Sequence, residues 1–306
     1  MNTTTLLCPA PLAIPDSLRL NIRFILGDAS DAWLENSAEL ARHLAGEWSV
    51  TPETVLEGGA MSLVVLCRTG AGEPVVLKIP ANKAMGMAES KALTAWNNGS
   101  VPRMIASDEE TGSFLMEFIT SAAVSPAATD ITALLARLHT PAVPGMHSLD
   151  EVLRERISGA AARFAGHGCG NERDDLAAAT VIIAALQVTA KQTMVHGDFQ
   201  AKNVLAAPDG PVAIDPLPAI GDPDSDLGLW IGGGSAGART QALWKFTATS
   251  PNPRRLLAWA WALAVLEYRP GRPGAVDAAD FIAGNRSTAA DALTSCVGSA
   301  VGAMGA

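Results

Sequence analysis

The sequence predicts an α+β protein with two lobes: a small N-terminal lobe built on an antiparallel sheet and a larger, mainly helical C-terminal lobe. Between residues 55 and 118, short β-like apolar runs alternate with turns. Beyond residue 125, apolar residues recur at helical spacing instead. One strand–turn–strand pattern, at 203–214, interrupts the helices. We therefore expect an N-terminal lobe at 1–118 and a C-terminal lobe at 119–306.

The small lobe is expected to hold two helices beside its strands. Residues 31–48 carry tryptophan and leucine at roughly helical spacing among polar residues, and residues 84–96 have similar character. The region 55–79 is typical of strands, with a glycine-containing turn at 70–72. The expected strands are 63–67, 74–79, 101–107 and 113–118.

The large lobe is expected to be helical apart from its hairpin. The helix at 171–186 opens with acidic residues, which the positive end of a helix dipole favours. The apolar run at 256–266 is too short to span a bilayer and indicates a buried helix. The expected helices are 127–139, 149–165, 171–186, 239–247, 254–267 and one or two within 277–297.

Three polar side chains make the hairpin the expected active site. Asp198 precedes it, Asn203 begins it and Asp215 ends it. With His196, the spacing His-x-Asp-x-x-x-x-Asn matches the catalytic loop of protein kinases. We expect Asp198 to orient an acceptor hydroxyl, and Asn203 and Asp215 to offer the oxygen ligands that magnesium prefers. A structural hairpin with an Asx turn is the alternative, but three such residues at this spacing favour phosphoryl transfer.

Segments before this hairpin, at its end and after it resemble a known enzyme family. They are 213–216, 221–223 and 226–227, with 62–65, 95–97 and 135–139 upstream. Together they resemble the aminoglycoside phosphotransferase family, and within it the streptomycin 6-phosphotransferase and hydroxyurea phosphotransferase branch. The resemblance extends over residues 57–230 and implies a protein-kinase-like fold.

The resemblance also implies an activity. It indicates an O-phosphotransferase that depends on magnesium and on ATP, or GTP, and that acts on a small, hydroxylated, cationic molecule such as streptomycin. Hydroxyurea, another antibiotic or a metabolite are the alternative acceptors. A nucleotide-binding pseudokinase belongs to another class, and the retained lysine, asparagine and aspartates argue against it. We expect a cytoplasmic monomer or weak dimer.

The N-terminal lobe is expected to bind the nucleotide. Lys78 lies in an apolar strand, where a buried charge needs a partner, and Glu89 is the sole acidic residue of the following helix. A lysine at a sheet edge that faces solvent is the alternative. Gly58, Gly59 and Ser62 are expected to form a loop over the phosphates, although both glycines would also suit an ordinary turn.

Five further residues are expected to assist. The resemblance implies that the backbone of Glu117 and Ile119 contacts adenine. It also implies that Asp222 and Asp226 brace the catalytic loop and cap the following helix. We expect His196 to support this loop; direct catalysis is the alternative, but kinases need positioning more than a second base.

The acceptor is expected to meet the C-terminal helices. Three acidic residues lie there in the sequence: Glu267, Asp277 and Asp280. We expect them to face an amino or guanidino group of the acceptor. The alternative is a solvated acidic surface.

Composition argues against several other function classes. The net charge of −9 makes a nucleic-acid partner unfavourable. The four cysteines are widely spaced, which argues against structural zinc and a disulfide framework and is consistent with reduced thiols in the cytoplasm. We expect no signal peptide and no membrane span, because the N-terminus has no basic region before an apolar core and no apolar stretch is long enough.

Two departures from the protein-kinase pattern indicate a kinase that needs no activation. Gly197 stands where regulated kinases carry the arginine that meets a phosphorylated activation loop. Pro216 follows the metal aspartate, and no A-P-E segment comes after it. Activation loops are ordered through arginine–phosphate pairs, so we expect activity without prior phosphorylation.

Overall fold

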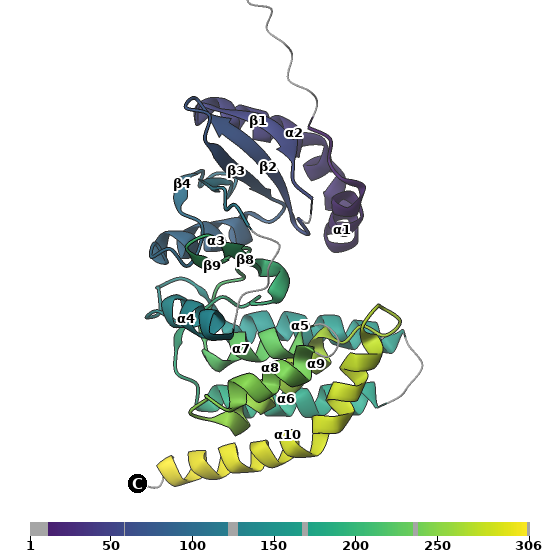
Figure 1. Cartoon of the computed structure of the whole chain (residues 1–306). Coiled ribbons are helices and arrows are strands. Elements are labelled where there is room, and N and C mark those ends of the chain that lie inside the picture. The colour runs from purple at the N-terminus through teal and green to yellow at the C-terminus, as the bar shows by residue number, and fades with distance from the viewer. Residues whose placement is uncertain (1–11, 58, 122–127, 167–170, 235–237, 305–306) are drawn as a thin grey trace, which may run out of the picture. The chain divides into compact units, whose positions relative to one another are not determined.

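The computed structural model describes residues 12–57, 59–121, 128–166, 171–234 and 238–304 (Figure 1). Contacts within the chain divide it into two compact units, Met1–Thr120 and Ser121–Ala306. The expected boundary, after residue 118, lies two residues earlier. The first unit contains an antiparallel sheet and the second is mostly helical, so the predicted α+β class is confirmed.

The N-terminal unit is built on a five-stranded antiparallel sheet with the strand order β1-β2-β3-β5-β4. The strands are β1 Val50–Val55, β2 Ser62–Thr69, β3 Pro74–Pro80, β4 Met104–Ser107 and β5 Phe114–Glu117. Strand β1 was not predicted as a separate strand. Three of its six residues are exposed and only Val50 is buried, so it lacks the apolar alternation that identifies a strand in a sequence.

Helices cover both faces of this sheet. They are α1 Asp16–Leu26, η1 Gly27–Ala29, α2 Ser30–Glu47 and α3 Lys83–Ala95. Helix α1 was not predicted; its buried residues Leu18 and Ile22 lie one turn apart and pack into the same core as α2. Along β3, Val75, Leu77 and Ile79 enter that core. Because side chains alternate along a strand, Lys78 points to the opposite face.

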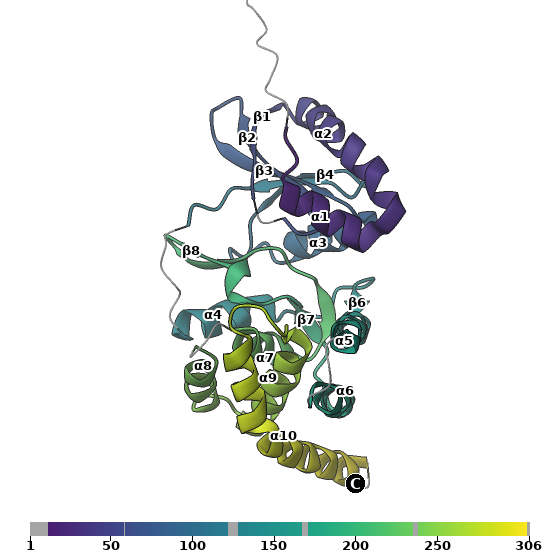
Figure 2. The ribbon, with the colours of Figure 1, turned by 90° about the vertical axis from the view of Figure 1, so that its right-hand side faces the viewer.

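The C-terminal unit packs its helices around α9. They are α4 Ala128–Leu138, α5 Leu149–Ala165, α6 Glu172–Val188, α7 Asp224–Gly232, α8 Ala238–Thr247, α9 Pro253–Glu267 and α10 Ala275–Met304. Helix α9 contacts α5, α6, α7, α8 and α10 (Figure 2). A Cβ atom on Gly228 of α7 would lie 2.6 Å from the Cβ of Trp259, so glycine permits this close approach. Among the residues that the structure describes, no helix has the length and apolar character to cross a membrane.

Short strands hold the loop that carries the expected active site. A three-stranded sheet has the order β6-β10-β7, with β6 His147–Ser148, β7 Thr193–Val195 and β10 Ala219–Gly221. After β7 come η2 Ala201–Asn203 and the antiparallel hairpin of β8 Val204–Ala207 and β9 Gly210–Ala213. The predicted hairpin is therefore confirmed. The two- and three-residue strands β6, β7 and β10 were not predicted, because such lengths show no periodicity.

Candidate active site

His196 joins the loop after β7 to the end of the hairpin. Its ring is fully buried. Nδ1 accepts a hydrogen bond from the backbone N–H of Asp198 at 3.3 Å, so Nε2 carries the proton and donates to the carbonyl of Ile214 at 3.0 Å. Burial lowers the pKa of His196 below its usual value, although nearby Asp226 and Asp198 oppose this. A neutral ring that uses both nitrogens in this way is a structural support.

Asp226 fixes the backbone of the same loop. Its two carboxylate oxygens accept hydrogen bonds from the N–H groups of His196 and Gly197, at 2.8 and 2.9 Å. Burial would raise the pKa of Asp226, but the nearby His139 ring and His196 lower it, so the carboxylate stays charged. Gly197 has a φ of +74°, and a Cβ there would lie 2.0 Å from the carbonyl oxygen of Leu217. The loop therefore requires glycine at this position.

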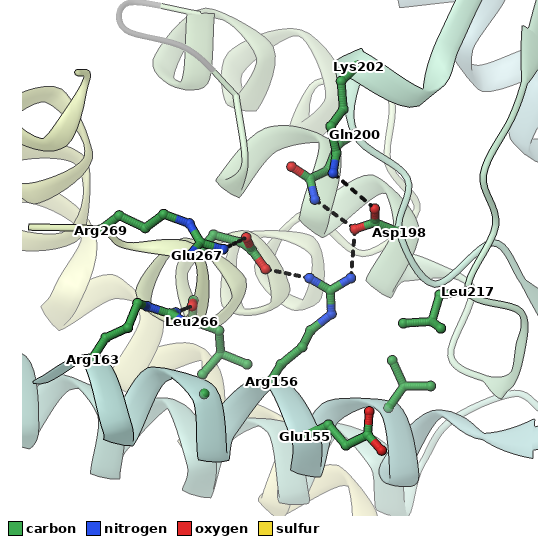
Figure 3. A pocket seen from close by; sticks show the side chains of 12 residues that line it. Glu155, Arg156, Arg163, Asp198, Gln200, Lys202, Leu217, Leu266, Glu267 and Arg269 are labelled. Atoms are coloured by element: carbon green, nitrogen blue, oxygen red, sulfur yellow. Dashed lines mark hydrogen bonds and ion pairs between the residues drawn. The ribbon is translucent and has the colours of Figure 1, made fainter. Parts of the chain in front are cut away.

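Asp198 projects from this fixed loop and is surrounded by donors (Figure 3). Its Oδ1 accepts hydrogen bonds from Arg156 Nη2 and Gln200 Nε2, each at 2.7 Å. Its Oδ2 accepts one from Asn203 Nδ2 at 2.8 Å, and Lys202 Nζ lies 3.4 Å away. Burial opposes ionisation, but the charges of Arg156 and Lys202 lower the pKa of Asp198 to about 2. Asp198 is thus a carboxylate at neutral pH.

Asn203 and Asp215 are brought together by the hairpin. The Ile214 N–H donates to the Asn203 carbonyl at 2.9 Å. Asp215 is the next residue after Ile214, so its backbone begins close to that of Asn203. Asp215 is exposed, with a φ of +57° that is uncommon for a residue other than glycine. The Asn203 Nδ2 faces the carbonyl and carboxylate of Asp198, so its side-chain oxygen points elsewhere.

This donor set fits a magnesium ion. Magnesium usually takes one or two protein oxygens and completes its shell with phosphates and water. One carboxylate and one amide oxygen meet that need. The part of the chain that the structure describes has no group of three or more His, Cys, Asp or Glu residues able to hold a metal, and such a group is not required here.

Asp222 ties the start of α7 to α9. Its Oδ1 accepts a hydrogen bond from the Asp224 N–H at 3.0 Å, and its Oδ2 accepts one from Trp259 Nε1 at 2.7 Å. Asp222 also forms an ion pair with Arg255. It holds the segment from which Asp226 reaches the catalytic loop, and its own contacts are with the helices.

Lys78 and Glu89 form a buried ion pair in the N-terminal unit. Lys78 Nζ lies 2.7 Å from each Glu89 carboxylate oxygen, and the side chains are only 6% and 9% exposed. Asn82 caps the start of α3 by accepting a hydrogen bond from the Met85 N–H, which fixes the helix that carries Glu89. The contact of Lys78 with phosphates stays a prediction.

The change Glu89→Gln tests this pair. We expect it to lower the free energy of unfolding by about 3–5 kcal/mol, because it removes the carboxylate charge that lies 2.7 Å from the buried Lys78 Nζ. It should also weaken nucleotide binding. Thermal unfolding and calorimetric titration measure the two effects, with the exposed Glu73→Gln as the matched control. Wild-type stability and nucleotide affinity in Glu89→Gln would contradict the role of the pair.

The other residues expected to bind nucleotide are less defined. Gly58 lies outside the described residues. A Cβ on Gly59 would come within 2.4 Å of the Ser62 carbonyl oxygen, so the chain there is tightly folded. The Glu117 N–H donates to the Arg103 carbonyl at 3.0 Å, and the contact of the Glu117 backbone with adenine stays a prediction. Ile119 is half-buried just after β5.

A pocket of about 320 Å³ lies beside Asp198 (Figure 3). Its lining includes Glu267, whereas Asp277 and Asp280 are exposed on α10 and do not line it. The charged residues in the lining are four cations, Arg156, Arg163, Lys202 and Arg269, and three carboxylates, Glu155, Asp198 and Glu267. This pocket therefore lacks the acidic surplus that we expected for a cationic acceptor.

Arg156 is the main residue of the site that was not predicted. It lies on α5 one turn from the buried residues Val152 and Ala160, so it occupies the buried stripe of that helix. A charge on an apolar stripe was the signal available in the sequence. Its partner Asp198 lies 42 residues further along the chain, and no pattern in the sequence connects the two residues.

Comparison with known proteins gives a consistent result. Residues 47–268 match the family described as aminoglycoside/hydroxyurea antibiotic resistance kinase. The chain is 27% identical to streptomycin 6-kinase of Streptomyces griseus, over 70% of this chain and 73% of that protein. It is 32% identical to hydroxyurea phosphotransferase of Kitasatospora aureofaciens, over 55% of this chain and 52% of that protein.

Solved structures share the fold at low identity. A putative fructosamine-3-kinase from Thermobifida fusca matches with a TM-score of 0.55 and 18% identity, over 83% of this chain and 98% of that one. A thermostable mutant of the aminoglycoside phosphotransferase APH(4)-Ia, in a ternary complex with ADP and hygromycin B, matches with a TM-score of 0.50 and 14% identity, over 85% of this chain and 97% of that one. These matches show a kinase-like fold.

Proposed function

The chain belongs to the aminoglycoside/hydroxyurea antibiotic resistance kinase family and is a small-molecule kinase, and from this premise we propose that it transfers the terminal phosphoryl group of ATP to a hydroxyl of an aminoglycoside such as streptomycin. The observation that carries the proposal is the ionised Asp198 carboxylate. It is held on a loop whose His196 and Gly197 N–H groups both donate hydrogen bonds to Asp226. Phosphoryl transfer depends on such positioning more than on covalent chemistry.

Each residue of the site has a proposed role. Asp198 orients the acceptor hydroxyl and takes its proton. Asn203 and Asp215 would hold magnesium, which when bound neutralises charge on the phosphates. Lys78, held by Glu89, aligns the phosphates.

An adenine nucleotide is the proposed donor. Its support is the structurally similar APH(4)-Ia, whose complex contains ADP. GTP is the alternative donor. We also propose a cytoplasmic location, since ATP is plentiful there and Cys67 is a buried free thiol.

The charge of the pocket beside Asp198 favours a second candidate acceptor. Four cations against three carboxylates suit a neutral molecule such as hydroxyurea better than a polycation. The chain is also similar to a hydroxyurea phosphotransferase. Hydroxyurea is small and uncharged, so this pocket would not repel it.

An acceptor screen tests the proposal. The protein, as purified and without prior phosphorylation, is incubated with magnesium, ATP or GTP, and streptomycin, other aminoglycosides, hydroxyurea or small metabolites. We expect a phosphorylated product by mass spectrometry with one acceptor class, and much slower formation of that product by Asp198→Ala. A KM for the acceptor that changes with salt would indicate that the acceptor is charged, because salt screens exposed charges, and a salt-independent KM would indicate a neutral acceptor. Failure to phosphorylate any of these acceptors would refute both candidates.

A further inference from the structure

Arg156 links three parts of the C-terminal unit. Its guanidinium donates to Asp198 Oδ1 at 2.7 Å and to the Gly197 carbonyl at 2.9 Å, and it forms an ion pair with Glu267 at the end of α9. Its side chain is only 16% exposed. Helix α5, which carries it, begins with a capping box of Ser148 and Glu151 that fixes the helix start. The start of the helix that carries Arg156 and the Arg156 guanidinium are therefore both fixed by contacts.

The contacts of Asp198 leave little freedom for an arriving hydroxyl. An ionised carboxylate offers about four acceptor positions. Here Oδ1 accepts from Arg156 and Gln200, while Oδ2 faces Asn203 and Lys202. An acceptor hydroxyl must therefore replace one of these donors.

Lys202 is the donor that is easiest to displace. Its side chain is 65% exposed, and its nitrogen lies 3.4 Å from Oδ2, longer than a strong charge-assisted contact. Arg156, by contrast, would have to leave Gly197 and Glu267 as well as Asp198. Breaking the several contacts of a buried guanidinium costs far more free energy than moving an exposed lysine side chain.

We propose that Arg156 is the positioning residue of Asp198. Anchored by Glu267, Arg156 holds Oδ1 in place, so that Oδ2 can accept a hydrogen bond from the acceptor hydroxyl once Lys202 has moved away. This inference rests on the proposed phosphotransferase activity and adds a residue to it. Glu267 then acts through Arg156 instead of binding a cationic group of the acceptor.

Variants at position 156 test the inference. We expect Arg156→Ala to lower kcat by about 100-fold, because a small misplacement of the reacting group has effects of that size. The KM for ATP should stay nearly unchanged. Arg156→Lys keeps the charge but lacks the planar guanidinium with its several N–H donors, so its kcat should fall between those of wild type and Arg156→Ala. Arg154→Ala, on the exposed face of the same helix, is the matched control and should keep wild-type rates.

Chemical rescue separates positioning from folding. Millimolar guanidinium chloride should restore part of the kcat of Arg156→Ala, relative to the same concentration of sodium chloride, and should not restore Asp198→Ala. If Arg156→Ala does not fold, Glu267→Gln serves instead, and we expect a smaller loss of kcat with an unchanged KM for ATP. A crystal structure of the variant should show the Asp198 carboxylate in more than one conformer.

The possible failures are distinguishable. An Arg156→Ala enzyme with wild-type kcat, or one whose loss appears only in the KM for ATP, would overturn the inference while the proposed function stands. A wild-type protein that phosphorylates no acceptor would refute the proposed function. In that event, a single unchanged Asp198 conformer in the Arg156→Ala crystal would overturn the inference as well, and a displaced or multiple conformer would support it.

Discussion

Replacing Asp198 with alanine is expected to lower kcat by about 10²–10⁴-fold, the range that a positioned acid or base contributes, while ATP binds with nearly unchanged affinity. The reason is its place in the loop. Its backbone is fixed through His196 and Asp226, and its carboxylate lines the pocket with Glu267. Removing it leaves the acceptor hydroxyl without an oriented base.

A rate assay and a calorimetric titration with magnesium and ATP separate the two effects. Asp209→Ala, on the exposed turn of the hairpin, is the control and should behave like wild type. Asp198→Asn should be nearly as slow as Asp198→Ala, because the amide keeps the shape but cannot take a proton. A near-normal rate in either variant would mean that another residue serves the hydroxyl.

The change Asp215→Asn is expected to weaken magnesium-dependent nucleotide binding and to lower turnover by about 100-fold or more, since a metal ion contributes several kcal/mol of charge stabilisation. It removes a charged ligand from a site that must balance phosphate charge. The substitution is clean, because asparagine tolerates the φ of +57° at this position as well as aspartate does. Asp215→Ala would add backbone strain, so its effect would combine that strain with the loss of the ligand.

Titrating ATP with and without magnesium measures this effect. In wild type, magnesium should tighten nucleotide binding, and in Asp215→Asn most of that gain should be lost. Asp209→Asn gives the matched control on the same hairpin. If magnesium-dependent binding and turnover both persist at wild-type levels, Asp215 is not a metal ligand.

The sequence was most informative where the interaction is local. Asp198, Asn203 and Asp215 lie just before or at the ends of one short hairpin, so they are near one another in the sequence, and two apolar runs around a turn predict that strand–turn–strand pattern. Lys78 and Glu89 were paired by a different argument: a charge inside an apolar strand needs a partner, and the next helix contains one carboxylate.

The elements that were missed have weak local signals. Strand β1 has one buried residue among its six, and β6, β7 and β10 are too short to show a period. They form because neighbouring strands satisfy their backbone groups. Helix α10 also extends to Met304, beyond the expected helical range of 277–297.

By itself, the sequence determined the fold class, the family and the residues that are candidates for phosphoryl transfer, because these depend on periodicity and on spacing within one segment. Only the tertiary structure decided which charges surround Asp198. Arg156 reaches it from a helix 42 residues earlier, and Glu267 anchors that arginine from the end of α9. Asp277 and Asp280, which looked equivalent to Glu267 in sequence, point to solvent. The face on which a side chain lies is set by how the helices pack, and packing joins residues that no local pattern connects.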